Sequence, residues 1–176
     1  MSELDLDAAL RSFEREAFRL EVLPAYNVPE ERDNLARYLA GDPLRPDPRR
    51  PWIDFIESSV RSGKRIDRVH ILPGRLTPYL RFEIEWGYLY SAQAGEEIFL
   101  LPQSDATPEL LARATLDFWL FDDTIGFMME YDEMGRFLGS APVTSSARIS
   151  ELTALKLELL KYATPLREWL ARERSK

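Results

Sequence analysis

Cysteine is absent from this chain of 176 residues, and histidine occurs only once, at His70. The missing thiols exclude disulfide bonds, zinc–thiolate sites, iron–sulfur clusters and cysteine nucleophiles. A single histidine cannot form a two-histidine metal site, and no motif supplies it with an acid or serine partner. We therefore expect His70 to have a structural role or to lie at the surface.

Long apolar runs are also missing, since no window approaches the length of a membrane span. The opening MSELDLDAALRSFERE is polar and acidic, whereas a secretory signal has a basic head followed by an apolar run. These two features predict a cytoplasmic protein without membrane contact.

Basic residues are fewer than acidic ones, 23 against 30, which gives a net charge of −7. The average field of such a chain repels a nucleic-acid backbone. We therefore expect a protein or small-molecule partner and no direct binding of nucleic acid.

The chain nevertheless holds enough apolar material for one sizeable core, because 45% of its residues are hydrophobic. We expect a single domain over residues 1–176. Its first helix carries an apolar face of Leu6, Leu10, Phe13 and Ala17, with Ser2 as a possible cap.

A second helix is expected between Pro29 and Gly41, after an extended stretch over residues 19–26. Four prolines then fall in GDPLRPDPRRPW, which predicts a proline-rich surface loop over residues 41–51. Pro51 is expected to open a third helix that Gly63 ends.

Residues 65–72, RIDRVHIL, alternate as a strand does, with Val69 and Ile71 on one face and Arg68 and His70 on the other. The next segment, residues 77–95, fits both a half-buried strand and an amphipathic helix. Its ends favour the helix, because a Thr-Pro pair begins it and a glycine follows it.

Four further strands are predicted over residues 97–102, 116–121, 124–132 and 136–139, the last three as a meander. The chain closes with a long helix that Pro165 interrupts near Thr164. The expected fold is therefore α+β: a mainly antiparallel sheet of about five or six strands, helices packed on one face, and a long C-terminal helix.

Three aspartates in LDFWLFDD, residues 116–123, are candidate functional acids. Asp122 and Asp123 fall where a turn begins, which favours turn chemistry over catalysis. Asp117 shares a strand face with Trp119, so burial would require a partner such as Arg68. A structural pair and a functional acid at a pocket edge both fit this position.

Sequence signatures of catalysis are missing: there is no G-x-G-x-x-G, no G-x-x-x-x-G-K-[ST] and no G-x-S-x-G. Acids are the only abundant ligands for Mg²⁺ or Mn²⁺, at Glu96, Glu97, Asp122, Asp123, Glu130, Asp132 and Glu133. No spacing among them matches an EF-hand loop. We therefore predict no catalytic residue, no metal and no cofactor, and favour a noncatalytic protein over an enzyme.

TPYLRFEIEWGY, AGEEI, DFWLFDD and YDEMGRFLG occur in that order along the chain. Together they resemble an actinobacterial family of unknown function whose members are often encoded beside XRE-type helix-turn-helix regulators. The resemblance implies a regulatory neighbourhood and assigns no catalytic residues.

Two hypotheses follow for the function. In the first, the chain is a regulatory or protein-interaction module that binds a helix-turn-helix regulator, because its acidic charge complements a basic partner. In the second, a pocket between the aromatic helix and the sheet binds a small ligand or cleaves a phosphoester with a divalent metal. Its candidate residues are Tyr79, Arg81, Trp86, Asp117, Trp119 and His70.

Overall fold

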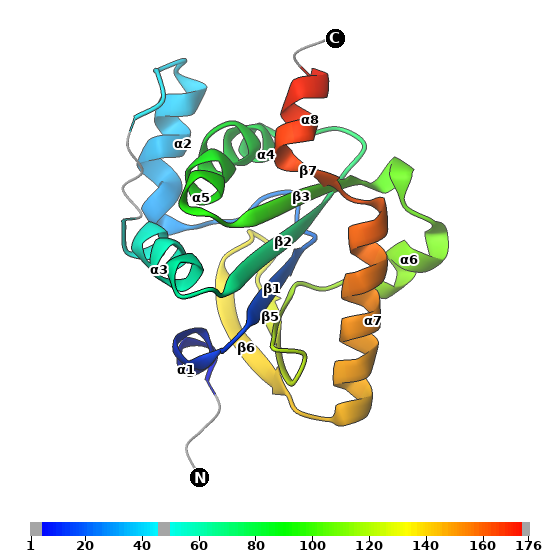
Figure 1. Ribbon diagram of the computed structural model, residues 1–176. Helices are drawn as coiled ribbons and strands as arrows, with labels where there is room; N and C mark the ends of the chain where they lie inside the picture. Colours follow the sequence, from blue (N-terminus) through cyan, green and yellow to red (C-terminus); the bar gives the residue numbers. More distant parts are fainter. Residues whose placement is uncertain (1–4, 46–49, 174–176) are drawn as a thin grey trace.

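The computed structural model describes residues 5–45 and 50–173, which form one sheet with helices on both sides (Figure 1). The sheet has seven strands. They are β1 (Glu16–Glu21), β2 (Arg65–Leu72), β3 (Glu97–Pro102), β4 (Phe118–Phe121), β5 (Ile125–Tyr131), β6 (Phe137–Val143) and β7 (Thr164–Pro165).

The sheet is mixed, with the strand order β6-β5-β4-β1-β2-β3-β7. β1, β2 and β3 are parallel to one another, whereas every other neighbouring pair is antiparallel. The expectation of a mainly antiparallel sheet with five or six strands was therefore wrong. The terminal meander β4-β5-β6 is antiparallel as predicted, but local turn signals could not show that the earlier strands run parallel.

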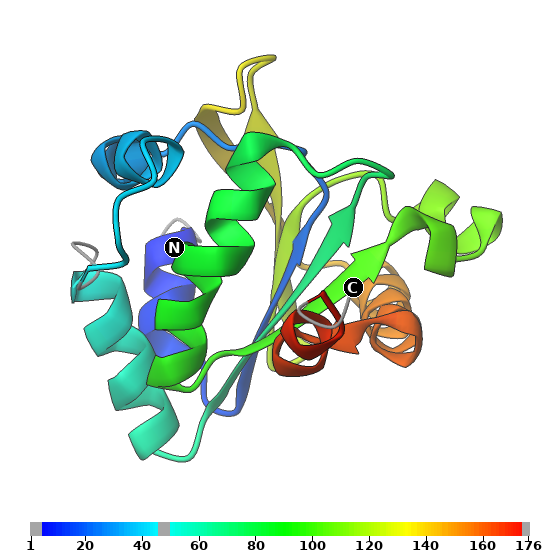
Figure 2. The same ribbon diagram turned by 90° about the horizontal axis from the view of Figure 1, so that it is seen from above.

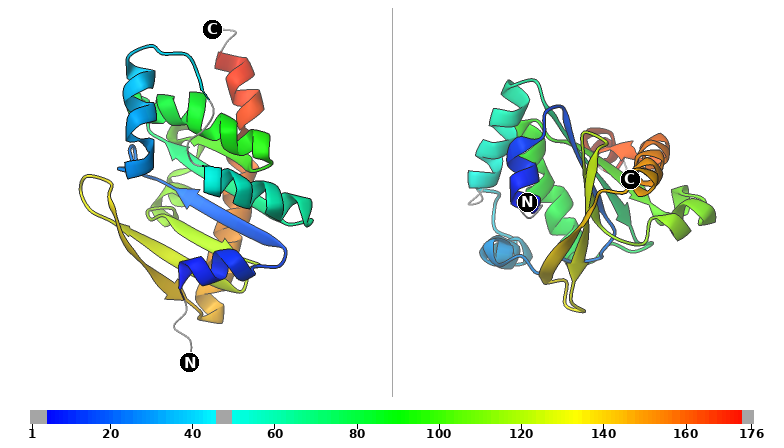
Figure 3. Two further views of the ribbon diagram at one scale, coloured as in Figure 1. Left: turned by 90° about the vertical axis from the view of Figure 1, so that its left-hand side faces the viewer. Right: turned by 90° about the horizontal axis from the view of Figure 1, so that it is seen from below.

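Two helical crossovers make the parallel pairs possible. The first joins β1 to β2 through η1 (Pro29–Glu31), α2 (Arg32–Leu39) and α3 (Arg50–Arg61). The second joins β2 to β3 through α4 (Pro78–Phe82), η2 (Glu83–Gly87) and α5 (Tyr88–Ala94). In Figure 3, left, α3 and α5 lie across the same face of the sheet, together with α1 (Leu6–Ser12).

The opposite face is covered by α6 (Pro108–Arg113) and α7 (Ser146–Tyr162), as Figure 2 shows from above. The prediction that helices pack on one face only was therefore wrong. The physical reason lies in the central strands, which are buried along almost their whole length on both faces, as FWLF in β4 and RIDRVHIL in β2 show. A strand that is buried on both faces needs cover on both sides.

Alternating side chains divide the core between these faces. Phe18, Leu20 and Val69 point toward α7, in a cluster that also contains Leu152 and Leu159. The other face carries Ala17, Ile66, Trp119, Phe121 and Phe127 toward α1 and α3. The predicted alternation of the second strand is confirmed, because Val69 belongs to the α7 cluster while Arg68 and His70 lie on the opposite side.

The first helix is shorter than expected. It ends at Ser12, and Ala17 belongs to β1, so Ala17 is not part of the helical face. Its cap is Asp5, whose side chain accepts a hydrogen bond from the Ala8 amide, whereas Ser2 lies outside the described residues. The extended segment that follows begins at Glu16, earlier than the expected residues 19–26.

The ambiguous aromatic segment is helical from Pro78 to Ala94, which confirms the choice of helix over strand. Thr77 caps it, and Gly95 follows with a φ of 110°. Its central turn, η2, is a π-helix that the sequence did not predict. Such bulges occur often at functional sites because they rotate the side chains around one turn.

The long C-terminal helix is interrupted where Pro165 predicted it. α7 ends at Tyr162, and α8 (Leu166–Glu173) begins after a two-residue strand that pairs with β3. The predicted proline-rich loop over residues 41–51 is partly confirmed: α3 begins at Arg50, and residues 46–49 lie outside the described part. None of the helices in the described ranges is long and apolar enough to cross a membrane.

Candidate functional site

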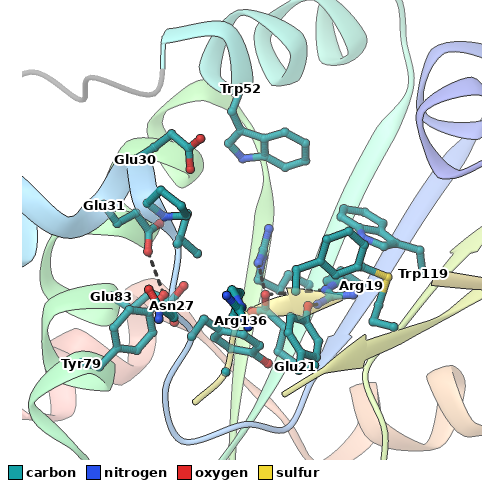
Figure 4. Close-up of a pocket in the computed structure, with 18 residues that line it drawn as sticks. Arg19, Glu21, Asn27, Glu30, Glu31, Trp52, Tyr79, Glu83, Trp119 and Arg136 are labelled. Atoms are coloured by element: carbon teal, nitrogen blue, oxygen red, sulfur yellow. Dashed lines mark hydrogen bonds and ion pairs between the residues drawn. The ribbon is translucent and has the colours of Figure 1, made fainter. Parts of the chain in front are cut away.

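A cavity of about 560 Å³ lies over one end of β1 (Figure 4). It is lined by residues of β1, the loop after β1, η1, α3, β2, α4, η2, β4, β5, the β5–β6 turn and the start of β6. The polar and aromatic lining residues are Arg19, Glu21, Tyr26, Asn27, Glu30, Glu31, Trp52, Arg68, Tyr79, Glu83, Trp119, Tyr131, Arg136 and Phe137.

The cavity lies where the chain path changes direction across the sheet. β1 has the parallel strand β2 on one side and the antiparallel strand β4 on the other. The chain leaves the carboxyl end of β1 at Glu21 and enters the loop that lines the cavity. Crevices outside the carboxyl ends of strands at such a switch point are the usual ligand sites of open α/β sheets.

Arg19 lies at the base of the cavity and is 3% exposed. Its Nη2 donates to Asp117 Oδ2 at 2.8 Å and to the Tyr131 hydroxyl at 2.6 Å. Burial opposes the charge, but Asp117 and Glu21 outweigh it and raise the pKa of Arg19. Its Nη1 is buried and has no hydrogen-bond partner among the described residues.

Arg68 is the second buried guanidinium, on the neighbouring strand β2. It donates to Glu21 at 2.6 Å and to Glu96 at 2.7 Å. Burial favours the neutral form of Glu21, but Arg68, His70 and Arg19 outweigh it and lower the pKa of Glu21 to about 2. The base of the cavity is therefore an ionised network of alternating charges.

Asp117 lies beneath the cavity and accepts hydrogen bonds from three directions. Its donors are Arg19, the Tyr26 hydroxyl at 2.7 Å and the Val22 amide at 2.9 Å. The partner is an arginine, as expected, but it is Arg19; Arg68, the arginine suggested from the sequence, is bound by Glu21 and Glu96. Burial raises the pKa of Asp117, and the Arg19 charge opposes this shift.

His70 lies in the same layer, fully buried beside the network. Its Nε2 lies 3.0 Å from the Leu23 carbonyl oxygen, and its Nδ1 lies 2.5 Å from the Tyr88 hydroxyl. That hydroxyl donates to Glu21 at 2.7 Å. Burial lowers the pKa of His70, although the Glu21 charge opposes the shift. The histidine is buried and supports the charged base, which agrees with the structural one of its two expected roles and excludes the surface position.

One wall of the cavity is acidic. Glu31 is 5% exposed and accepts a hydrogen bond from the Tyr79 hydroxyl at 2.8 Å. Glu83, equally buried, is the first residue of the π-helix η2, and its Oε2 lies 3.8 Å from His70 Nδ1. Figure 4 places both carboxylates on the side of the cavity opposite Arg19.

The other wall and the roof are aromatic. The rings of Trp52 and Trp119 meet edge to face, with centroids 6.2 Å apart. The Arg19 guanidinium lies 5.6 Å from the centroid of the Trp119 ring. Because Trp52 lies in the first turn of α3, it reaches over the cavity from the helical layer.

The turn between β5 and β6 forms the rim. The Asn27 amide donates to the Gly135 carbonyl at 2.9 Å, which joins this turn to the loop after β1. Gly135 has a φ of 73°, and a Cβ there would lie 2.5 Å from the Ala25 carbonyl oxygen. Only glycine fits this contact without a shift of the backbone.

The chain matches the family profile described as "Domain of unknown function (DUF6879)" over residues 4–171. It belongs to the DUF6879 family. A search of curated proteins finds no significant match. The DUF6879 assignment confirms the expected resemblance to a family of unknown function, and by itself it assigns no activity to any residue.

The structure of this DUF6879 chain brings together some of the predicted pocket residues. Tyr79 and Trp119 line the cavity, while Asp117 and His70 lie in the layer beneath it. Arg81 is exposed and does not line it. Trp86 is also outside the lining, because it is buried against Tyr38 and Phe82.

Asp122 and Asp123 lie in the β4–β5 turn, both with positive φ, at 53° and 56°. The Asp122 carboxylate accepts hydrogen bonds from the amides of Glu14, Arg15 and Glu16. Asp123 accepts from Lys156 at 2.7 Å. These contacts hold the turn against the start of β1 and against α7, which are distant from it in the sequence.

The remaining acids suggested as metal ligands do not converge. In the parts of the chain that the structure describes, no group of three acid or histidine side chains is placed to hold a metal ion. Glu96 binds Arg68, and Asp132 binds Arg136 within its own turn. This donor arrangement gives no support to metal-dependent phosphoester cleavage.

Several lining residues were missed by the sequence analysis, and three of them carry much of the site: Arg19, Glu21 and Glu83. A signal existed for the first two, because charged Arg19 and Glu21 alternate with apolar Phe18 and Leu20. Such alternation places two charges on one face of a strand. Glu83 had no comparable signal, because the π-turn changes which side of the helix faces the sheet.

Proposed function

We propose that this DUF6879 domain is a small-molecule-binding domain whose ligand occupies the cavity over β1. The observation that carries the proposal is the convergence of buried, ionised side chains with aromatic walls in one cavity at a strand switch point. Pockets with a few placed polar groups among aromatic side chains are typical ligand sites.

The buried network supports binding more than stability. The Coulomb attraction of a buried ion pair does little more than offset the cost of removing both charges from water. Apolar residues of equal size therefore often stabilise a core at least as much as a buried ion pair does. The network is also incomplete, since Arg19 Nη1 has no partner in the described chain. A bound molecule with a hydrogen-bond acceptor would complete it.

A thermal-shift screen of small molecules of varied charge tests the proposal. True ligands should raise the unfolding midpoint of the wild-type protein and have less effect on Trp52→Ala, which removes part of the cavity roof. Trp169→Ala is the matched control, because Trp169 packs in a different cluster. Ligands that stabilise all three proteins equally, or a screen without any ligand, would reject the proposal.

We propose regulatory protein binding as a second candidate function, with a helix-turn-helix regulator as the partner. The net charge of −7 complements a basic DNA-binding protein. The hairpin at the cavity rim exposes three apolar side chains, Met134, Phe137 and Leu138. Phe137 also lines the cavity, so a ligand and a partner would contact the same hairpin.

Calorimetric titration with the helix-turn-helix regulator encoded nearest to this gene tests this second function. Binding that weakens as salt is raised supports an electrostatic contribution. Leu138→Ser should weaken it further, because Leu138 is 61% exposed on the hairpin. The absence of heat at low and high salt would reject the regulatory interaction and leave ligand binding untouched.

A further inference from the structure

The charges around the cavity are unequal. Among the described residues, three guanidiniums line it, from Arg19, Arg68 and Arg136, and each is paired with an acid. Four carboxylates line the same space: Glu21, Glu30, Glu31 and Glu83. Three more bind the guanidiniums from behind: Asp117, Glu96 and Asp132. Carboxylates therefore exceed guanidiniums by seven to three.

The excess is concentrated on one wall. Glu30, Glu31 and Glu83 lie together on the side opposite Trp119, as Figure 4 shows. Electrostatic attraction is strong in such a partly desolvated space, so a positive group is favoured beside this wall and a negative one is repelled. The rings of Trp52 and Trp119 add negative ring faces, which attract organic cations.

The opposite end of the cavity, at Arg19, favours a neutral ligand group. The Arg19 guanidinium is already neutralised by Asp117, so it does not call for a second anion. Its buried Nη1 still lacks an acceptor among the described residues. A neutral hydroxyl or carbonyl oxygen satisfies such a donor without adding charge.

We propose, building on the ligand-binding function above, that the cavity takes a small organic cation. Its ammonium group lies beside Glu31 and Glu83, its planar or apolar body packs against Trp52 and Trp119, and an oxygen at its far end accepts from Arg19. The ligand class is therefore an amine-bearing molecule with a distal hydrogen-bond acceptor.

Matched probes test this assignment by calorimetric titration. Phenethylamine, 2-phenylethanol and 3-phenylpropionate have the same ring and differ in charge, and tyramine adds a distal hydroxyl to phenethylamine. We expect phenethylamine to bind about tenfold more tightly than the alcohol or the carboxylate, and tyramine to bind more tightly still.

Variants that remove one carboxylate charge each test which acidic residues attract the ammonium group. Glu31→Gln keeps an acceptor for the Tyr79 hydroxyl but removes the charge, so it should weaken phenethylamine about tenfold and leave 2-phenylethanol unchanged. Glu30→Gln, at an exposed position on the same wall, provides a second variant that keeps the buried structure intact. Glu85→Gln is the control, because Glu85 is exposed and binds Tyr38 outside the cavity.

The outcomes separate this inference from the proposed function. Equal or tighter binding of 3-phenylpropionate would overturn the cation assignment while showing that the cavity binds small molecules. Failure of all four probes at concentrations up to about 10 mM would also overturn it. The diverse thermal-shift screen then decides independently whether the cavity binds any ligand.

Discussion

Arg19 and Asp117 face each other across the antiparallel boundary between β1 and β4, with guanidinium and carboxylate 2.8 Å apart. They come from sequence positions 98 residues apart. Both are almost fully buried, at 3% and 2% exposure, on the side of the sheet that carries the cavity. This pair joins the half of the sheet built from parallel strands to the antiparallel meander and forms the base of the site.

Removing one member of this pair should be costly. Asp117→Ala leaves the Arg19 charge buried without its main counter-ion and leaves the Tyr26 hydroxyl without its acceptor, so we expect a loss of about 3–5 kcal/mol. The double variant Arg19→Met, Asp117→Leu should lose less than Asp117→Ala alone. Urea unfolding measures both, and a loss below about 1 kcal/mol for Asp117→Ala would contradict the pairing.

The β4–β5 turn should contribute more stability than an ordinary surface turn. Asp122→Ala removes a carboxylate that accepts from three backbone amides, so we expect a loss of about 2–3 kcal/mol in unfolding free energy. Asp42→Ala is the comparison, since Asp42 forms an exposed pair with Arg37. Equal effects of the two substitutions would show that the three amide contacts contribute nothing.

Gly135 fixes the rim of the cavity. Gly135→Ala imposes a positive φ on alanine and brings its Cβ against the Ala25 carbonyl, so we expect a loss of about 1–3 kcal/mol and weaker ligand binding. Gly139→Ala, in the same hairpin, has open space around the new Cβ and should change little. Thermal unfolding of both variants checks this, and similar midpoints would refute the contact.

His70 should remain neutral near pH 7, because burial disfavours its charged form. Its folded pKa lies below the ordinary 6.5. The unfolded chain therefore binds more protons below pH 6.5, and this group makes stability fall as the pH falls through that range. Nitrogen-detected NMR of this single histidine reports both features; a titration midpoint at or above 6.5 would contradict them.

Asp67 should have the opposite effect on stability. Burial raises its pKa from 3.8 to about 7, with the Arg65 charge opposing the shift. The folded chain then holds a proton that the unfolded chain has lost, so stability falls as the pH rises from about 4 to 7. Asp67→Asn mimics the protonated form, and its stability relative to wild type should increase over that range by about 2–4 kcal/mol. A constant difference in urea midpoints would disprove this.

Local signals in the sequence predicted most elements but not their arrangement. The helix from Pro78 to Ala94, the break near Pro165 and the meander could be found, because caps, prolines and turn residues act over a few positions. The parallel pairing of β1 with β2 and β3 could not, because it depends on contacts between distant segments. Burial of both sheet faces followed from that pairing.

The site was predictable only in part, for the same reason. The sequence analysis named Trp119, Tyr79 and Asp117 as candidate pocket residues. It did not identify the residues that they contact. Arg19 meets Asp117 only after β1 and β4 pair, and no spacing in the sequence joins them. Arg81 was misplaced because it is two residues from Tyr79 in α4 and therefore lies on the opposite, exposed side of that helix. Trp86 was misplaced because it lies in the π-turn, which changes the direction of the side chains along the helix.

The most direct test of ligand binding uses the two neighbouring methionines of β5. Met129 lines the cavity, whereas Met128 packs on the α7 side of the sheet. Methyl NMR of methionine-labelled protein, titrated with phenethylamine and with ligands from the thermal-shift screen, should shift the Met129 resonance and leave that of Met128 unchanged. Shifts confined to Met128, or no shift of Met129 with any compound, would contradict a ligand site over β1.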